Sequence, residues 1–119
     1  MRILIVDDNK DILQLVQHVL QVEGHEVIVA NDGFEAVQRE ATTAPDVVVC
    51  DINLPGISGW EVCKRIKARR NVPLMLLTVH AEQDDIDRSV QSGADDHMIK
   101  PFDLDEFVQR IERLAAQGA

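Results

Sequence analysis

The sequence predicts a doubly wound α/β sandwich, in which helices cover both faces of a five-stranded parallel sheet. Five short apolar runs recur at nearly regular spacing, at residues 3–6, 27–30, 47–50, 74–77 and 98–99. Between them the apolar period changes from that of a strand to that of a helix. The connections are too short for anything but right-handed parallel crossovers, which completes the case for this fold class.

The first half of the chain is expected to form three strands and two helices. Runs 3–6 and 47–50 contain no polar residue, as expected for strands that are buried on both faces. Gly24 ends the first helix, and Pro45 marks the turn before the third strand. Asp32 begins the second helix, because its side chain stands three residues before a glutamate. The first helix carries an apolar stripe of Ile12, Leu13, Val16, Val19 and Leu20.

The second half continues the same alternation. Run 74–77 is again uninterrupted, and run 98–99 forms a short last strand. Ser58 and Asp103 each stand three residues before a glutamate, so each is expected to begin a helix. The last helix carries an apolar stripe of Leu104, Phe107, Val108, Ile111 and Leu114.

The helix expected between residues 82 and 93 is poorly patterned. Its only clear aliphatic anchors are Ile86 and Val90, which stand among acidic residues and an arginine. This pattern favours either a solvated helix or one that is loosely docked and able to move. Gly93 is expected to end it.

Several conspicuous side chains are assigned to structure rather than to chemistry. Cys50 ends an apolar run and Cys63 lies on a helical stripe, so both are expected to be reduced, buried thiols. Trp60, near the start of the third helix, is assigned to packing and should report on the neighbouring site by its fluorescence. Arg69 and Arg70 are expected to solvate the C-terminus of that helix.

Composition narrows the class of protein. The 119 residues suit one domain over 1–119 that can bury a core without disulfides or a structural metal. A net charge of −9, from 21 acidic and 12 basic residues, argues against direct nucleic-acid binding. No apolar run reaches the length of a membrane span and no signal peptide precedes the first strand, so a cytoplasmic protein without membrane contact is expected.

Polar residues follow the predicted strands at the edge where ligands of such folds bind. Asp7 and Asp8 follow the first run, and Asp51 follows the third. Thr78 follows the fourth run, and Lys100 follows the fifth. A single aspartate after a strand is usually a turn or capping residue, but this whole set at one edge indicates a common crevice.

These residue types favour phosphoryl chemistry with a metal ion. Three neighbouring carboxylates are tolerated only when they are protonated or when a cation lies among them. Oxygen ligands open to solvent suit Mg²⁺, with Mn²⁺ as a second possible ion. Lys100 can bind a phosphate and the Thr78 hydroxyl can donate to it. A carboxylate beside such a site can itself take a phosphoryl group.

The sequence resembles the receiver domain of response regulators, the phosphoacceptor part of two-component signalling. The segments that carry the resemblance are ILIVDDN, DINLPGISGWE, LLT and GADDHMIKPF. Together they are highly specific, and the resemblance extends from Ile3 to about Leu114. It implies a flavodoxin-like fold with the strand order 2-1-3-4-5.

The resemblance implies a role for each residue of the predicted metal site. Asp51 would accept a phosphoryl group from the phosphohistidine of a histidine kinase. Asp7 and Asp8 would bind Mg²⁺ together with Asp51 and the backbone carbonyl of Asn53. The domain would catalyse only its own phosphorylation and dephosphorylation, and would not be an enzyme in the usual sense.

The resemblance also implies how the phosphoryl group is held and sensed. Lys100 and the backbone N–H of Val79 would bind phosphoryl oxygens, and Thr78 would turn inward to hydrogen-bond one of them. The bond between Lys100 and Pro101 is typically cis in this family, as proline permits. Thr78 and His97 occupy the positions of the two switch residues.

Partners follow from the same resemblance. A sensor histidine kinase or a phosphotransfer protein would donate the phosphoryl group. A downstream output protein or a fused effector domain would read the surface of the fourth helix, fifth strand and fifth helix. A homodimer through the fourth and fifth helices is common in the family.

Two positions depart from the usual pattern, and two others tune the lifetime of the phosphoryl group. His97 stands where the family usually has Tyr or Phe, so its protonation could make the output depend on pH. Val79 stands where a small residue is usual, which predicts restricted access and an altered phosphoryl lifetime. Asn53 and His80 occupy positions that tune hydrolysis of the phosphoryl group.

Three other functions compete with this interpretation. A flavin protein of the flavodoxin type would need a Ser/Thr-rich phosphate loop after the first strand, where this chain has DDNKD. A Mg²⁺-dependent phosphatase of the haloacid dehalogenase class would need an aspartate two residues after its nucleophile, where this chain has Asn53. A receiver-like docking module that no longer takes phosphate stays open because of His97 and Val79.

Overall fold

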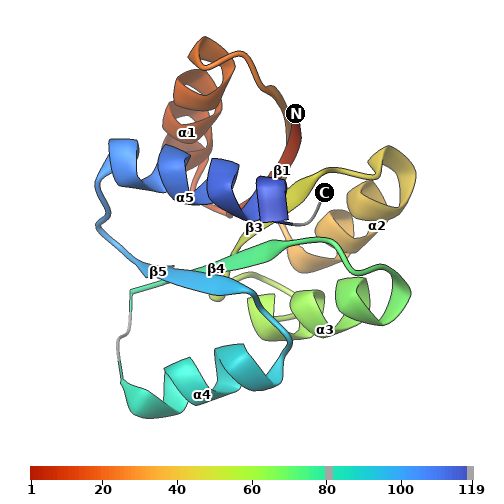
Figure 1. Ribbon diagram of the computed structural model, residues 1–119. Coiled ribbons are helices and arrows are strands. Elements are labelled where there is room, and N and C mark those ends of the chain that lie inside the picture. The colour runs from red at the N-terminus through yellow and green to blue at the C-terminus, as the bar shows by residue number, and fades with distance from the viewer. Residues whose placement is uncertain (80–81, 118–119) are drawn as a thin grey trace.

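The computed structural model describes residues 1–79 and 82–117, and it shows the expected doubly wound α/β sandwich (Figure 1). Within these residues all strands are parallel and form one sheet in the order β2-β1-β3-β4-β5, which confirms the fold and the strand order. The strands are β1 (Arg2–Val6), β2 (Glu26–Ala30), β3 (Val47–Asp51), β4 (Leu74–Thr78) and β5 (Asp96–Ile99). The helices are α1 (Lys10–Val22), α2 (Gly33–Thr43), α3 (Gly59–Arg69), α4 (Gln83–Gln91) and α5 (Leu104–Gln117).

The two faces of the sheet carry separate apolar cores. Successive side chains of a strand point to opposite faces, so each central strand contributes to both cores. Ile3, Ile5, Val47 and Val49 pack with residues of α1 and α5 on one face. Leu4, Val6, Val48 and Cys50 pack with residues of α2 and α3 on the other. This double burial explains why β1, β3 and β4 appear in the sequence as continuous apolar runs.

Helix ends fall where the sequence places them. The side chains of Asp32, Ser58 and Asp103 each accept a hydrogen bond from the backbone N–H three residues later, which confirms three predicted helix starts. Gly24 and Gly93 follow α1 and α4 with φ of +91° and +94°, a backbone conformation that side chains other than glycine rarely adopt. No helix in the described residues is both long and apolar enough to cross a membrane.

Two predictions about the helices were wrong. Val90 is 67% exposed, and the buried residue of α4 is Ser89, so the helix is turned away from its predicted apolar anchor. Arg69 and Arg70 do not simply solvate the end of α3, because both form ion pairs with Glu40 of α2, whose side chain is fully buried. The two cysteines are free and buried, as predicted.

Candidate metal centre

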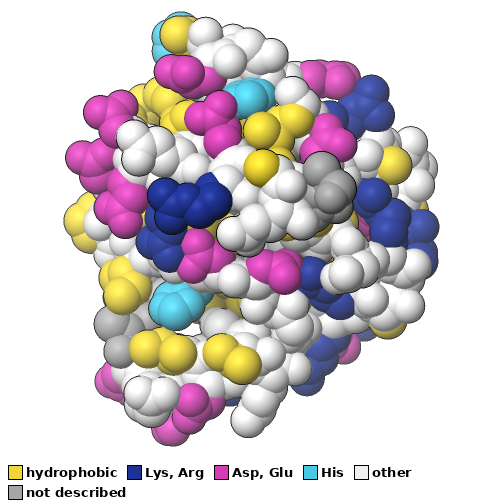
Figure 2. All heavy atoms as spheres, viewed as in Figure 1, with side chains coloured by type: hydrophobic (Ala, Val, Ile, Leu, Met, Phe, Trp, Pro, Cys, Tyr) yellow, Lys and Arg dark blue, Asp and Glu magenta, His cyan; other side chains and the backbone are white. Residues whose placement is uncertain are grey.

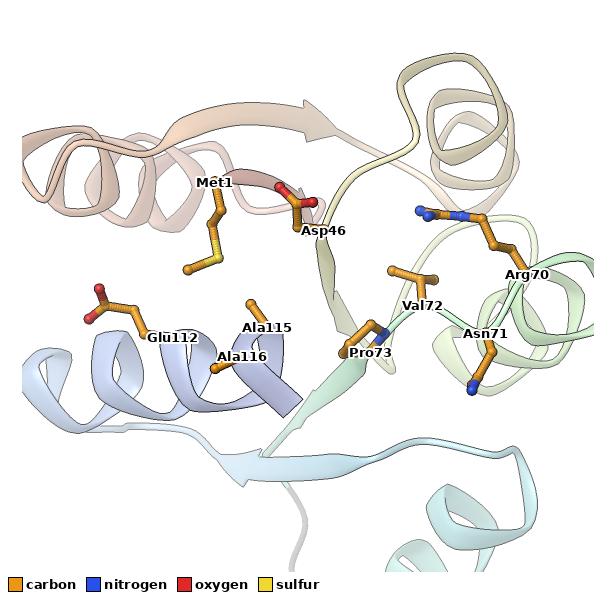
Figure 3. Close-up of a pocket in the computed structure, with 9 residues that line it drawn as sticks. All are labelled: Met1, Asp46, Arg70, Asn71, Val72, Pro73, Glu112, Ala115 and Ala116. Atoms are coloured by element: carbon orange, nitrogen blue, oxygen red, sulfur yellow. The ribbon is translucent and has the colours of Figure 1, made fainter. Parts of the chain in front are cut away.

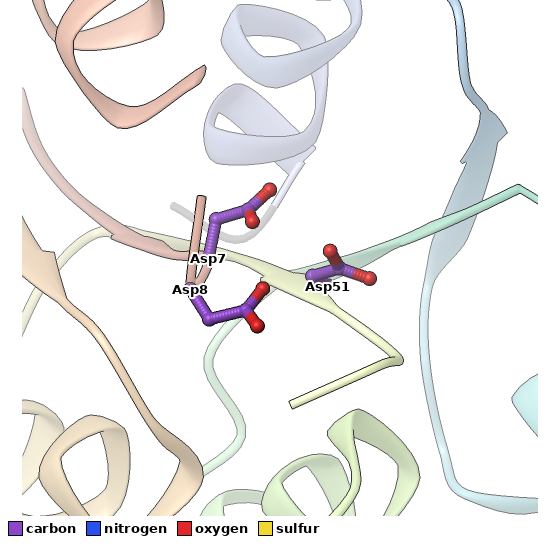
Figure 4. A group of neighbouring side chains, drawn as sticks. All are labelled: Asp7, Asp8 and Asp51. Carbon is purple, nitrogen blue, oxygen red and sulfur yellow. The ribbon is translucent and has the colours of Figure 1, made fainter. Parts of the chain in front are cut away.

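Three carboxylates meet at the carboxyl edge of the sheet. Asp7 and Asp8 directly follow β1, and Asp51 is the last residue of β3, which pairs with β1 through Val6 and Cys50. One carboxylate oxygen from each aspartate lies within 4.8 Å of the other two (Figure 4). Asp7 and Asp51 are buried, whereas Asp8 is exposed. This set of oxygen donors, open to solvent on one side, fits a hard divalent cation such as Mg²⁺.

Local turns fix the two buried carboxylates. Asp7 Oδ1 accepts a hydrogen bond from the Asn9 backbone N–H at 2.9 Å, and Asp51 Oδ1 accepts one from the Asn53 N–H at 3.0 Å. Such bonds, from a side chain to the backbone two residues on, are typical of aspartate at a sharp turn. They orient each carboxylate so that its Oδ2 remains available to other partners.

Asn9 is a residue of this site that the sequence interpretation missed. Its side chain caps α1 by accepting hydrogen bonds from the N–H groups of Asp11 and Ile12, while its own N–H holds Asp7. Asp11 lies in the first turn of α1 and is exposed. The available signal was an asparagine immediately before a helical apolar stripe, which is a common helix start.

Lys100 joins the two buried carboxylates. Its Nζ donates to Asp7 Oδ2 at 2.7 Å and to Asp51 Oδ2 at 2.9 Å. A hydrogen bond from the Lys100 N–H to the Thr78 carbonyl, at 2.7 Å, holds the backbone of Lys100 there, and the peptide bond to Pro101 is cis. One ammonium among three carboxylates leaves an excess of negative charge, which favours binding of a cation.

The charges of this cluster shift one another's protonation. Burial raises the pKa of the Asp51 carboxyl above its ordinary value, against the opposing hydrogen bonds from Lys100 and the Asn53 N–H. Burial alone would lower the pKa of Lys100, but the hydrogen bonds to Asp7 and Asp51 outweigh it, so the pKa of Lys100 is raised. Lys100 therefore stays charged at neutral pH.

The other residues predicted for the site differ in how close they lie to the carboxylate edge of the sheet. Thr78 ends β4 and is buried, and Val79 follows it with 54% of its surface exposed. His97 pairs in register with Leu76 of β4, so it lies behind the edge of the sheet that carries the carboxylates. Its backbone is held by Asp96 and Arg110. The predicted role of His80 falls outside the described residues.

Two hollows of similar size lie at opposite ends of the sheet. An apolar one of about 410 Å³ borders the carboxylate cluster, and Val79, Lys100 and Phe102 are among its lining residues. The other, also of about 410 Å³, lies where β1, β3 and β4 begin (Figure 3). Its lining includes Asp46 and Arg70 but none of the three clustered aspartates. The two ends are therefore chemically distinct, and only one of them carries the predicted site.

Comparison with known proteins agrees with this geometry. The family model of the response regulator receiver domain matches residues 3–112. The chain belongs to this family. The receiver domain of two-component response regulators is a signalling domain, so the predicted class of function is confirmed.

Relatives of known function support the same assignment. The chain is 39% identical over 114 residues to the alkaline phosphatase synthesis transcriptional regulatory protein PhoP of Bacillus subtilis. It is 40% identical over 114 residues to the transcriptional regulatory protein PrrA of Mycobacterium leprae. These alignments cover 95% of this chain but 48% and 49% of the relatives, so the chain spans about half the length of the curated relatives that it matches.

Solved structures share the fold over nearly the whole receiver domain. A two-component response regulator from Clostridium difficile superposes with a TM-score of 0.94 at 27% identity, covering 98% of this chain and 97% of that one. The chemotaxis protein CheY4 of Vibrio cholerae superposes with a TM-score of 0.90 at 30% identity, covering 95% and 97%.

In metal-free buffer at neutral pH, Asp51→Asn is expected to increase the free energy of unfolding of the receiver domain. The pKa of Asp51 is higher in the folded state than in the unfolded state, so the native state retains its proton to a higher pH. Stability is therefore lost as pH rises from the ordinary pKa of aspartate through the pKa of the folded state. The gain should therefore disappear at a pH below the ordinary pKa of aspartate. Urea unfolding of both proteins at about pH 3.5 and about pH 7 measures it.

The matched control for this prediction is Asp105→Asn. Asp105 is an exposed carboxylate in the first turn of α5, where a negative charge is mildly stabilising. Its removal is expected to leave stability unchanged or slightly lower it. A loss of stability in Asp51→Asn at neutral pH would show that the ion pair with Lys100 outweighs the burial of the carboxylate.

Proposed function

We propose that this receiver domain is a Mg²⁺-dependent phosphoacceptor switch in which Asp51 receives the phosphoryl group. The observation that carries the proposal is the cluster of Asp7, Asp8 and Asp51, whose two buried members are bridged by Lys100. The donor is the phosphohistidine of a sensor histidine kinase or a phosphotransfer protein. A carboxylate oxygen of Asp51 forms the new P–O bond as the P–N bond of the donor breaks.

The carboxylates provide the ligands for the cation. Asp7, Asp8 and Asp51 hold Mg²⁺, or Mn²⁺ in its place, with the backbone carbonyl of Asn53 as a further ligand. The bound ion supplies positive charge that neutralises phosphoryl oxygens. The domain thereby promotes its own phosphorylation and dephosphorylation, largely by positioning and electrostatics.

Lys100 and the end of β4 bind the phosphoryl group from the other side. The Lys100 ammonium, which already contacts Asp51 Oδ2, pairs with a phosphoryl oxygen, and the Val79 N–H donates to another. The exposed Val79 side chain narrows the approach, so the phosphoryl lifetime differs from that of a domain with a small residue there. Asn53 and His80 tune the access of water.

Phosphorylation changes the surface that β5 forms with α4, and a partner detects this change. Thr78 turns its hydroxyl toward the phosphoryl group, and His97 then shifts beside α4, with a protonation state that makes the output sensitive to pH. Val90 and Ile99 are exposed on α4 and β5, and Figure 2 shows hydrophobic side chains beside a histidine on this face. This surface contacts a downstream protein, a fused effector domain or a second copy of the domain, all in the cytoplasm.

Acetyl phosphate tests the proposal directly. Incubation with Mg²⁺ and acetyl phosphate should add one phosphoryl group to the wild-type protein, as measured by intact mass, and none to Asp51→Asn. Chelation of the metal should abolish the adduct, and the matched variant Asp105→Asn should keep it. An adduct of equal yield on Asp51→Asn would place the acceptor elsewhere.

Two further outcomes identify the competing functions. No adduct from either acetyl phosphate or a cognate kinase would favour a docking module that takes no phosphate. Rapid turnover of unrelated phosphoesters would favour a phosphatase. Both outcomes contradict the phosphoacceptor switch.

A further inference from the structure

Helix α4 has little apolar attachment to the rest of the domain, because Ile86 is only partly buried. Ser89 is its only buried residue, while Val90 is 67% exposed. Glu82, which precedes the helix, makes no side-chain capping hydrogen bond. A helix of this length is marginal without tertiary packing, so something other than an apolar stripe must fix its position.

Polar contacts with α3 provide that attachment. The indole N–H of Trp60 donates to Ser89 Oγ at 3.1 Å, and the guanidinium of Arg88 lies 3.9 Å from the centre of the indole ring. Ser89 Oγ in turn donates to the Asp85 carbonyl at 3.0 Å, so the buried hydroxyl both accepts and donates a hydrogen bond. We call Trp60, Arg88 and Ser89 the α3–α4 latch. Both helices lie on the same side of the sheet (Figure 1).

The latch begins next to the end of β3, where the proposed phosphoacceptor Asp51 lies. Gly59, the first residue of α3, donates its N–H to the Ile52 carbonyl at 2.8 Å. A Cβ atom at Gly59 would lie 2.3 Å from the Asp51 carbonyl oxygen, so this helix start is pressed against the backbone of the acceptor residue. Trp60 is the next residue, and α3 therefore connects Asp51 to α4 through close contacts.

We propose that Trp60 is a positioning residue for α4, which it holds against α3 through a hydrogen bond to Ser89 and a cation–π contact with Arg88. The latch sets the position of α4, and with it the surface formed by α4 and β5. This inference rests on the proposed function in one respect: phosphorylation at Asp51 is taken as the event to which α4 responds. A weaker contact, from the Cys63 thiol of α3 to the carbonyl of Ser92 at 3.3 Å, holds the residue directly after α4 and remains when the latch is removed.

Hydrogen exchange of backbone amides in the metal-free protein tests the latch. Ser89→Ala and Trp60→Phe remove opposite ends of one hydrogen bond, and each is expected to speed exchange within α4 by roughly tenfold. The double variant should speed exchange by less than the product of the two single effects, because both changes delete the same hydrogen bond. Amides of β3 should keep their wild-type rates, which separates release of α4 from general destabilisation.

Two further variants complete this experiment. Arg88→Gln lies on the exposed side of the latch and so tests it without a buried substitution; we expect exchange in α4 to rise roughly threefold. Thr42→Ala, which removes an exposed hydroxyl from α2, should leave α4 unchanged. The inference is overturned if α4 of the latch variants exchanges at the wild-type rate, or if exchange in β3 is accelerated equally. It is also overturned if the effects of the two single substitutions multiply in the double variant.

Loading of the site then tests the link to Asp51. With Mg²⁺ and beryllium fluoride, a phosphoryl analogue, exchange in α4 of the wild type should change, and this change should fall by more than half in Trp60→Phe. A full-sized change in Trp60→Phe would overturn the link. If the acetyl phosphate experiment fails, the proposed function fails, but the metal-free comparison still decides whether the latch holds α4.

Discussion

Lys100→Met is expected to slow phosphorylation of Asp51 by acetyl phosphate by roughly 10²-fold to 10³-fold, the usual cost of removing a group that stabilises charge in a transition state. The Lys100 ammonium contacts the two buried carboxylates at 2.7 and 2.9 Å. Methionine has a similar length without the charge, so the variant removes the cation and retains most of the packing. Intact mass followed over time measures the rate.

The same substitution should tighten binding of the divalent cation. In the metal-free domain the ammonium of Lys100 already neutralises Asp7 and Asp51, and it therefore competes electrostatically with an incoming ion. Loss of that competing charge should raise the affinity for Mg²⁺ by about tenfold, which calorimetric titration can measure. Slow phosphorylation combined with tight metal binding would separate the role of the lysine from that of the metal.

Lys64→Met is the matched control, because Lys64 lies exposed on α3 and is not part of the cluster. It should change neither the rate nor the affinity. If Lys100→Met lost metal binding and phosphorylation together, Lys100 would be needed to assemble the carboxylates rather than to bind the phosphoryl group.

The site could be predicted from the sequence because a parallel sheet brings the ends of distant strands together. Asp7, Asp51 and Lys100 are far apart in the chain, yet each directly follows, or ends, a strand whose apolar run is plain in the sequence. Strand order was the one feature of the sheet that periodicity could not supply. It came from the resemblance to receiver domains.

Contacts between helices could not be predicted in the same way. The hydrogen bond from Trp60 to Ser89 depends on how α4 is rotated about its axis, and the segment has too few apolar residues to fix that rotation. The apolar pattern therefore favours Val90 as an anchor, whereas the residue that the structure buries is Ser89. Glu40 did leave a signal, because it lies on the same helical face as Gly33 and Ala36, both buried. A charged residue on such a face needs a partner.

The Arg69→Ala/Arg70→Ala double variant is expected to lose about 3–5 kcal/mol of unfolding free energy, the range observed when one side of a buried ion pair is removed. Glu40 is fully buried between α2 and α3, and Arg70 Nε donates to its Oε2 at 3.0 Å. Arg69 binds the other carboxylate oxygen. Without the two guanidinium groups, the buried carboxylate loses both of the charged partners that it has among the described residues. Urea unfolding at neutral pH measures the loss.

Arg65→Ala is the matched control for the double variant, because Arg65 is an arginine of the same helix with a similarly exposed side chain. Arg65 forms an ion pair with Glu61 at 3.7 Å, and both side chains are nearly half exposed. Exposed pairs of this kind contribute little, so the change in unfolding free energy should be below about 0.5 kcal/mol. A loss comparable to that of the double variant would point to helix propensity or packing instead.

Replacing Glu40 in the Arg69→Ala/Arg70→Ala variant identifies the physical cause of its lost stability. Adding Glu40→Met to the double variant should recover most of the lost stability, because an apolar side chain has no charge to desolvate. If the triple variant is no more stable than the double variant, the arginines contribute through packing and through the Arg70 hydrogen bond to the Pro45 carbonyl at 2.5 Å. Arg70 lines the hollow at the opposite end of the sheet from Asp51, so phosphorylation by acetyl phosphate should keep its wild-type rate wherever these variants remain folded (Figure 3).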